Sequence, residues 1–154
     1  MTAILTTPHI RDIPLTELPA IKPLWQALNQ IHFADSIYYQ DFYKDFTFEK
    51  RMAFLNRMNT EDVKISVIQT GEQIQGYCLS TVREGTGEIE SLYVDPSLQK
   101  QNYGTALMSL HKSWFRQRNC TKIKVTVAFG HDSVMEFYHK QGFYERLIEL
   151  ELKE

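Results

Sequence analysis

Little in this sequence supports a disulfide framework or a metal centre. The 154-residue chain has only two cysteines, Cys78 and Cys120, which lie far apart in apolar stretches. This spacing excludes a CxxC motif and a Cys/His zinc cluster, and it is typical of small buried hydrophobic residues. The five histidines also lack metal-ligand spacing. We therefore predict a protein without a metal.

Long apolar runs and an excess of one charge are missing as well. No stretch approaches the roughly 20 apolar residues that span a bilayer, and the N-terminus has no basic segment followed by an apolar core. We therefore expect a cytoplasmic protein with no membrane partner. Nucleic-acid binding would favour a strongly basic face, and the formal net charge of -2 gives no electrostatic case for it, so we expect no nucleic-acid partner either.

The chain does contain enough apolar residues for one hydrophobic core. Hydrophobic residues make up 43% of the sequence, and a domain of about 150 residues usually buries about two-thirds of its unfolded surface. No internal repeat, linker or low-complexity tract divides the chain. The sequence therefore predicts a single domain over residues 1–154.

The periodicity of apolar residues predicts a mixed α/β (α+β) domain with the element order βααβββαβαβ. Helical spacing predicts helices over residues 15–34, 48–58, 103–117 and 133–140. Alternating or β-rich runs predict strands over residues 8–13, 63–70, 74–82, 88–94, 122–128 and 144–152. The aromatic and acidic stretch 35–45 has no clear period, so we predict a loop there.

The turn between the strand that ends at Val94 and the helix that begins near Tyr103 suits a pyrophosphate. Backbone N–H groups and the positive end of a helix dipole would meet there. Gly104 would let the backbone approach a ligand without a Cβ, and Asn102 tolerates a left-handed φ. Lys100 adds a positive charge. An ordinary helix N-terminus would have the same features, so the loop by itself leaves both interpretations open.

Two motifs in the correct order resemble those of the GNAT N-acetyltransferase superfamily. Residues 99–104, Gln-Lys-Gln-Asn-Tyr-Gly, are similar to its coenzyme A-binding core Gln/Arg-x-x-Gly-x-Gly/Ala. Residues 131–143, His-Asp-Ser-Val-Met-Glu-Phe-Tyr-His-Lys-Gln-Gly-Phe, resemble its second signature Asn-x-x-Ala-x-x-Phe-Tyr-x-x-x-Gly-Phe. The resemblance covers residues 63–152 well and the preceding sixty only in element order. Asn102 replaces the first glycine of the family, and His131 replaces an asparagine that usually contacts the pantetheine arm.

The resemblance implies a GNAT-like fold, in which a V-shaped split opens a mixed central sheet that carries helices on both faces. It also implies acetyl-CoA as co-substrate. The pantetheine arm would pair with residues 92–94, and the Leu92 N–H would polarise the acetyl carbonyl. The residues expected to bind the cofactor are Leu92, Tyr93, Val94, Gln99, Lys100, Gln101, Asn102, Tyr103, Gly104, Thr105, His131, Ser133 and Tyr138.

Three residues are predicted to be catalytic. Glu88 and Glu90 lie two apart on one strand, so regular alternation would place both on the face of Leu92 and Val94. A carboxylate can accept the proton of an alkylammonium, although two ordinary solvated carboxylates would give the same pattern. The resemblance places Tyr138 near the thioester sulfur, where its phenol would protonate the departing thiolate. Without the resemblance, Tyr138 is an aromatic residue that packs on its neighbours.

Aromatic residues alternate with aspartates between residues 33 and 45. By resemblance, the first two helices and their connecting loop shape the acceptor pocket, and aromatic faces with carboxylates suit a cation. We predict that Asp35, Tyr38, Tyr39 and Asp41 bind a small-molecule or peptide amine. A loop that covers the core or a dimer partner would show the same pattern.

These observations lead to one main hypothesis about function and two alternatives. The main hypothesis is an N-acetyltransferase that moves an acetyl group from acetyl-CoA to a primary amine by direct attack in a ternary complex, because neither motif contains a cysteine that could form an acyl-enzyme. A catalytically silent CoA-binding regulatory domain with the same fold is the first alternative. The second is an α/β interaction module that binds no nucleotide. The resemblance also predicts a possible homodimer.

Overall fold

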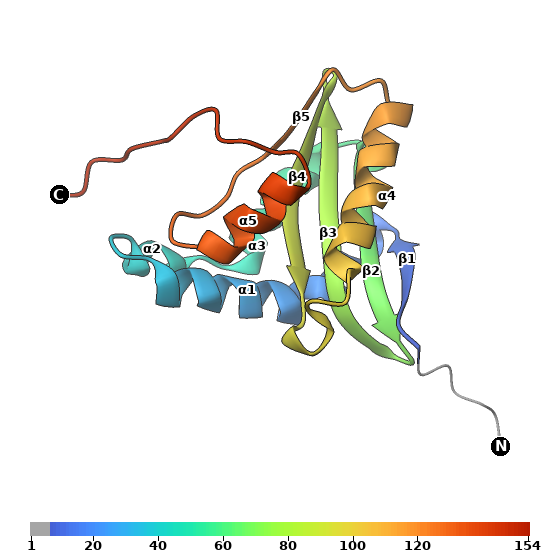
Figure 1. Ribbon diagram of the computed structural model, residues 1–154, viewed down its shortest axis with the longest axis horizontal. Coiled ribbons are helices and arrows are strands. Elements are labelled where there is room, and N and C mark those ends of the chain that lie inside the picture. The colour runs from blue at the N-terminus through green and yellow to red at the C-terminus, as the bar shows by residue number, and fades with distance from the viewer. Residues whose placement is uncertain (1–6) are drawn as a thin grey trace.

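A five-stranded mixed sheet forms the centre of the computed structural model, which describes residues 7–154 and leaves residues 1–6 of the predicted domain outside it (Figure 1). The strands follow one another across the sheet in chain order. The first four pair antiparallel, whereas the fifth is parallel to the fourth. They are β1 (His9–Ile13), β2 (Val63–Thr70), β3 (Gln73–Arg83), β4 (Thr86–Val94) and β5 (Lys122–Val125).

Helices cover both faces of this sheet (Figure 1). They are α1 (Lys22–Asp35), α2 (Gln40–Asp45), α3 (Phe48–Met52), α4 (Tyr103–Gln117) and α5 (Asp132–Lys140). One core cluster packs α1 and α3 on the sheet through residues such as Trp25 and Phe48. The other packs α4 and α5 on the opposite face through residues such as Phe115 and Tyr138. The predicted mixed sheet with helices on both faces is confirmed.

The N-terminal helical segments differ from the prediction. Residues Leu15–Ile21 form a 3₁₀ helix that contains Pro19, and α1 begins only at Lys22 with a proline in its first turn. Proline suits the first turn of an α-helix but not its interior, which explains the division. The stretch 35–45, predicted as a loop, contains α2. The predicted helix 48–58 is α-helical only to Met52 and continues as a 3₁₀ helix over Ala53–Arg57.

The predicted last strand over residues 144–152 is wrong. These residues have no regular structure, are exposed, and lead away from the sheet (Figure 1). Gly142, with a φ of 93°, turns the chain at the end of α5. The alternating pattern of a strand is present, but a strand also needs a partner to accept its hydrogen bonds. The fifth strand is also shorter than predicted, because it ends at Val125.

A β-bulge in β4 changes the direction of its side chains. The register pairs Leu79 with Ser91 but Ser80 with Ile89, which leaves Glu90 without an opposite residue. Ile89, Leu92 and Val94 all pack in the α4–α5 core, while Tyr93 packs in the α1–α3 core. One extra residue reverses the alternation along the strand. The prediction that Glu88 and Glu90 share a face with Leu92 and Val94 is therefore wrong.

A buried histidine connects α4 with β2 and β3. His111 is fully buried, and its Nδ1 and Nε2 lie 2.7 Å and 2.9 Å from the hydroxyl oxygens of Ser80 and Ser66. Ser66 donates its own proton to Asp12 at 2.5 Å, so it accepts from Nε2–H, and Nδ1 accepts from Ser80. Burial, followed by the nearby Lys64 ammonium, lowers the pKa of His111 to about 3. The ring is neutral in the folded protein at ordinary pH.

We predict that His111 makes the protein less stable in acid. Below about pH 6.5 the unfolded chain protonates this histidine, whereas the folded protein does so only near a pKa of about 3. Between these values the free energy of unfolding should fall as pH falls, by about 1.4 kcal/mol per pH unit for one proton. Chemical denaturation between about pH 6.5 and 4.5 should show a shallower fall for His111→Gln than for the unaltered protein. Equal slopes would contradict a buried neutral histidine.

Candidate active site

The strands β4 and β5 separate after four paired residues. Their parallel register runs from Thr86 opposite Lys122 to Ile89 opposite Val125. Among residues 7–154, no strand therefore lies on that side of β4 beyond Ile89. The Asp95 N–H donates to the carbonyl of Gln75 on the β3 side at 2.8 Å. In an antiparallel pair, consecutive residues point their N–H and C=O groups alternately towards the partner strand and away from it. Because Asp95 points towards β3, Leu92 and Val94 direct their N–H and C=O groups away from β3 and into the gap. The predicted V-shaped split is present, and its edge offers peptide groups to an extended ligand.

The loop after β4 presents backbone amides at the N-terminus of α4. Lys100 and Asn102 both adopt left-handed φ values, 64° and 67°, and α4 starts directly afterwards. The first helical hydrogen bond is donated by the Ala106 N–H to the Asn102 carbonyl at 3.0 Å. The amides of residues 103–105 precede that bond and point out of the helix end. Together with the helix dipole they form an arrangement that suits a pyrophosphate.

Gly104 faces α5 in this structure. A Cβ at Gly104 would lie 3.2 Å from Cε1 of Phe137, so the missing side chain makes room for α5. The prediction that this glycine lets the backbone approach a ligand receives no support from that contact. Gln99 and Gln101 hold the loop instead, because their side-chain amides donate to the carbonyls of Val94 and Ser97 at 2.8 Å and 3.1 Å.

Tyr138 lies on α5 with only 7% of its surface exposed. Its ring packs edge-on against Phe137 and Phe143, with centroids 5.3 Å and 5.8 Å apart. Burial raises the pKa of the phenol above its usual value, so the hydroxyl remains protonated and able to donate. Ser133, in the first turn of the same helix, is exposed.

The two glutamates of β4 have different surroundings. Glu90, the bulge residue, accepts a hydrogen bond from the Thr81 hydroxyl at 2.6 Å, and its side chain is 7% exposed. Arg51 of α3 contacts both the carbonyl and the carboxylate of Glu90, at 2.7 Å and 3.3 Å. Glu88 is more accessible, and its nearest cation is the ammonium of Lys124 at 3.7 Å. Burial, followed by the negative charge of Glu90, raises the pKa of Glu88.

The structure joins His131 to two residues of α1. His131 precedes α5 and is buried; its Nδ1 lies 3.0 Å from the Asp35 carboxylate, and its Nε2 lies 2.7 Å from Nδ1 of His32. This chain of contacts connects the layer of α1 with the layer of α5. Burial, followed by the neighbouring His131 ring, lowers the pKa of His32 to about 4. Both ring nitrogens of His131 are engaged, so the ring lacks the free hydrogen-bonding group that an asparagine would offer to a pantetheine arm.

His32 was not among the predicted site residues. His32 and Asp35 are three residues apart in a helix, so their side chains lie on the same side of it. This proximity could be predicted from the sequence. The contact with His131, which lies 99 positions further along the chain, depends on how α5 packs and has no signal in the sequence.

The four predicted acceptor residues do not converge on one pocket. Asp35 pairs with His131, and the Tyr39 hydroxyl donates to the carbonyl of Glu151. Tyr38 is 60% exposed, and Asp41 is exposed on α2.

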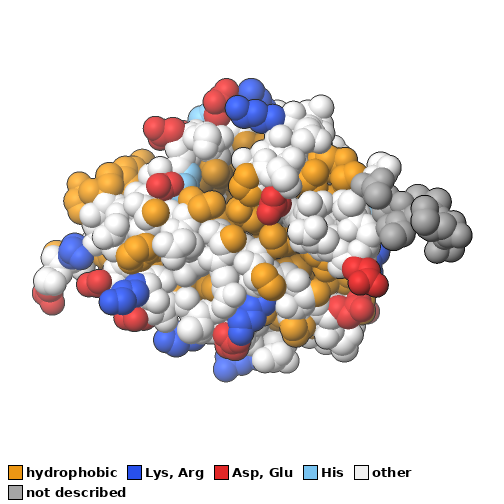
Figure 2. Space-filling view, turned by 90° about the horizontal axis from the view of Figure 1, so that it is seen from below, with side chains coloured by type: hydrophobic (Ala, Val, Ile, Leu, Met, Phe, Trp, Pro, Cys, Tyr) orange, Lys and Arg blue, Asp and Glu red, His pale blue; other side chains and the backbone are white. Residues whose placement is uncertain are grey.

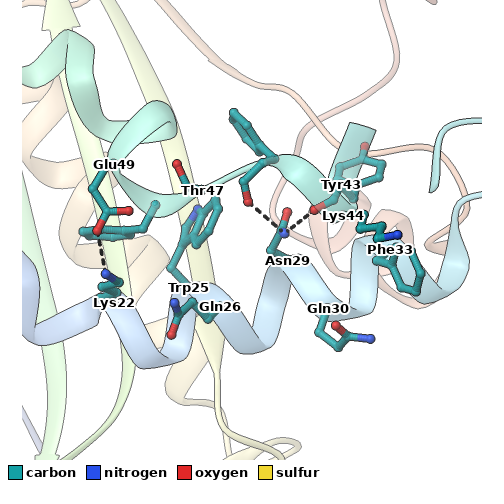
Figure 3. Close-up of a pocket in the computed structure, with 12 residues that line it drawn as sticks. Lys22, Trp25, Gln26, Asn29, Gln30, Phe33, Tyr43, Lys44, Thr47 and Glu49 are labelled. Atoms are coloured by element: carbon teal, nitrogen blue, oxygen red, sulfur yellow. Dashed lines mark hydrogen bonds and ion pairs between the residues drawn. The ribbon is translucent and has the colours of Figure 1, made fainter. Parts of the chain in front are cut away.

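A groove of about 480 Å³ lies between α1, α2 and α3 (Figure 3), and none of its lining residues comes from β4 or α5. Asn29 projects into this region and donates to the carbonyls of Tyr43 and Phe46 at 2.8 Å and 3.4 Å. Its Oδ1 is buried and has no hydrogen-bond partner in the part of the chain that the structure describes. This groove is therefore separate from the split.

Within residues 7–154, no three or more His, Cys, Asp or Glu side chains are arranged to hold a metal ion. None of the helices in that same part of the chain has the length and apolar character that crossing a membrane requires.

One family model matches most of the chain. The model of the acetyltransferase (GNAT) family matches residues 25–143. A search of curated proteins finds no match. A solved structure of PaiA N-acetyltransferase from Thermoplasma acidophilum in complex with coenzyme A is similar over 93% of both chains, with 15% identity and a TM-score of 0.76.

Two further solved structures have the same fold. An aminoglycoside acetyltransferase, meta-AAC0020 from an uncultured soil metagenomic sample in complex with sisomicin, is similar over 95% of both chains, with 16% identity and a TM-score of 0.70. The ribosomal-protein-S18-alanine N-acetyltransferase from Escherichia coli is similar over 92% of this chain and 80% of its own, with 17% identity and a TM-score of 0.65.

We predict that one backbone amide at the start of α4 contributes to coenzyme A binding. Thr105→Pro removes an N–H that precedes the first helical bond, in the first turn of α4, so it costs no helical hydrogen bond. Thr105→Ala keeps this N–H and removes only the hydroxyl, which accepts from the Gln141 amide at 3.1 Å. Isothermal titration calorimetry should show about tenfold weaker binding of coenzyme A to the proline variant, about 1.4 kcal/mol. Equal losses in both variants would contradict a role for the amide, and melting temperatures without ligand control for folding.

Proposed function

The chain belongs to the acetyltransferase (GNAT) family, and on that premise we propose that it transfers an acetyl group from acetyl-CoA to a primary amine by direct attack in a ternary complex. The observation that carries the proposal is the split between β4 and β5. It leaves the peptide groups of Leu92 and the N–H of Val94 without a strand partner on that side, next to a helix N-terminus with free amides. An acyl-CoA has the two complementary parts, an extended arm with amide groups and a pyrophosphate.

The arm would lie along the edge of β4, and the pyrophosphate would lie at the amides of residues 103–105 with Lys100 nearby. The Leu92 N–H would then face the acetyl carbonyl and stabilise the oxyanion that forms when the amine attacks. Residues Gln99 and Gln101 would act indirectly, because their side chains hold the loop. The close contact of Gly104 with Phe137 would keep α5, and with it Tyr138, against the start of α4.

The acceptors of the structural neighbours support an amine as the second substrate. One neighbour is an aminoglycoside acetyltransferase bound to sisomicin, and another is an N-acetyltransferase for an alanine of a ribosomal protein. A positively charged amine would be attracted to this protein by the carboxylates of Glu88 and Glu90, on the α1–α3 side of the sheet.

Thiol-release assays with acetyl-CoA and a panel of amines test the proposed function. The panel should include an aminoglycoside, a polyamine and a peptide with an N-terminal alanine. Thiol release that depends on one of these amines is the expected result. Coenzyme A binding without amine-dependent release would instead support a silent CoA-binding domain. Absence of binding in calorimetry would support an interaction module.

Between the two glutamates, the structure favours Glu88 as the proton acceptor. Its raised pKa is closer to neutral pH, where a general base works best. Glu90 is already held by Thr81 and Arg51, and its charge helps to keep the pKa of Glu88 high. Glu88 lies in the paired part of β4, so the proton of the alkylammonium would reach it through water.

We predict that kcat/KM falls at low pH as Glu88 becomes protonated. Glu88→Gln should remove this acid limb and lower the rate at neutral pH about 100-fold, within the range of general bases. Glu90→Gln removes the neighbouring negative charge, so it should lower the pKa of Glu88 and move the acid limb to lower pH. The measurement is the pH profile of kcat/KM for all three proteins. Loss of the limb in Glu90→Gln but not in Glu88→Gln would assign the base to Glu90.

Tyr138 is the proposed general acid, because a buried phenol with a raised pKa is protonated at neutral pH and can donate to the departing thiolate. We predict that Tyr138→Phe lowers kcat by about 10- to 1000-fold, the usual range for such a group. The ring and its packing are retained in this variant, so the dissociation constant for acetyl-CoA should change little in calorimetry. A kcat close to that of the unaltered protein would mean that Tyr138 contributes only to packing and is not the general acid.

A further inference from the structure

A second hollow lies at the end of the sheet where β3 turns into β4, at the top of Figure 1. Its volume is about 560 Å³, which is in the range of cavities that bind small molecules. None of its lining residues belongs to β4, to the loop before α4 or to α5. The hollow is therefore separate from the split and from the helix N-terminus that suits a pyrophosphate.

Three arginines from separate elements line this hollow. They are Arg57 after α3, Arg83 at the end of β3 and Arg118 after α4. Arg118 is already paired, because its guanidinium donates to the Asp62 carboxylate and to a backbone carbonyl, both at 2.5 Å. In the part of the chain that the structure describes, the arginines in ion pairs are Arg51 and Arg118, so the other two are unpaired. At the opposite end of the molecule, by contrast, basic and acidic side chains are interspersed (Figure 2).

An aromatic ring holds one of the two unpaired guanidinium groups in place. The central carbon of the Arg83 guanidinium lies 5.1 Å from the centroid of the Phe54 ring, which is a cation–π contact. A ring supplies no oxygen acceptor, so the N–H donors of Arg83 remain available to a ligand. The planar arrangement of these donors matches two oxygens of a carboxylate or a phosphate. The positioned Arg83 side chain therefore suits an oxyanion.

The remaining wall of the hollow is largely apolar. Phe54, Met58 and Val82 line it beside the arginines, so it offers contact to an apolar part of a ligand. The lining residues include one more carboxylate, that of Glu84, which is exposed in the turn between β3 and β4. Water and salt screen a charge at such a position. The hollow thus combines two unpaired cations with an apolar surface.

We propose that this hollow binds a small organic anion, whose phosphate or carboxylate group contacts Arg57 and Arg83 and whose apolar body contacts Phe54, Met58 and Val82. Hydrogen bonds between ionised partners are about twice as strong as those between neutral groups. Two guanidinium groups can share the oxygens of one oxyanion, which leaves the rest of the molecule against the apolar wall. This ligand differs from acyl-CoA in its site, because the split lies outside the lining residues.

An anion in the hollow would also influence Glu88. Burial and the charge of Glu90 raise the pKa of Glu88, and this rise is opposed by the charged groups that face it from β5, α3 and β3, namely Lys124, Arg51 and Arg83. An anion on Arg83 would offset one of these positive charges and raise the pKa of Glu88 further. This consequence rests on the proposed function, in which Glu88 accepts the proton of the amine. The bound anion would then reduce the rate in mildly acidic solution.

The first test measures binding to the full chain by isothermal titration calorimetry. The probes are phenyl phosphate, phenylacetate, inorganic phosphate and phenol. At least one of the two aromatic anions should bind with a dissociation constant of about 1 mM or lower, and the stronger of the two identifies the preferred oxyanion. Inorganic phosphate should bind about tenfold more weakly because it has no apolar body, and phenol should not bind. Absence of binding by both aromatic anions, or equal binding of inorganic phosphate and phenyl phosphate, would overturn the proposal.

Variants of the two unpaired arginines test where the anion binds. Arg57→Gln and Arg83→Gln should each weaken binding of the aromatic anion by at least about tenfold, because each removes a charge-assisted contact. Arg83→Lys keeps the charge without the planar donors, so it should restore only part of the affinity. The matched control Arg146→Gln removes an exposed arginine that does not line the hollow, and it should bind normally. Equal affinity of Arg83→Gln and this control would place the anion elsewhere; melting temperatures without probe verify folding.

The effect on Glu88 is measured without turnover. Carbon-13 NMR of the glutamate carboxyl groups follows the titration of Glu88, and a saturating aromatic anion should move it to higher pH. Arg83→Gln should raise the pKa of Glu88 by itself and abolish the response to the anion. An unchanged titration despite binding in calorimetry would refute the link between the hollow and Glu88. Neither readout requires acetyl transfer, so a failure here is distinct from an absence of amine-dependent thiol release.

Discussion

The limited pairing between β4 and β5 is the constraint on which the candidate site depends. The two strands share four paired positions and then diverge. The divergence coincides with the bulge at Glu90, and Arg51 of α3 donates to the carbonyl of that residue at 2.7 Å. A bulge bends its strand and increases the local twist. The α1–α3 layer therefore contributes to the shape of the sheet edge where an acyl-CoA would bind.

The same region is also where the two helical layers meet. Elsewhere the sheet separates them, but at the split His131 reaches Asp35 and His32 of α1. These contacts hold the start of α5 against α1. Both ring nitrogens of His131 are engaged in these contacts, so the ring offers no free nitrogen to a ligand in this arrangement.

The stretch 35–45 illustrates how one composition can serve several roles. Its aspartates and aromatic residues predict a cation site, and the structure distributes them between different partners. Asp35 pairs with His131, and Tyr39 contacts the C-terminal segment. Tyr43 lines the groove, where its carbonyl accepts a hydrogen bond from the Asn29 side chain.

The sequence by itself determined the features that depend on neighbouring residues. The bounds of α4 and of β2 follow from local periodicity, and the left-handed φ of Asn102 follows from its tolerance of that conformation at a helix start. The two motifs were likewise sufficient to predict the family. Only the tertiary structure decided which side chains face each other. The bulge that reverses β4 after Ile89 depends on its register with β3. The contact between His32 and His131 joins residues 99 positions apart. The segment 144–152 has the alternation of a strand but no partner in its own sheet. In each case the outcome depends on packing or pairing with a distant part of the chain, which local patterns of residues do not encode.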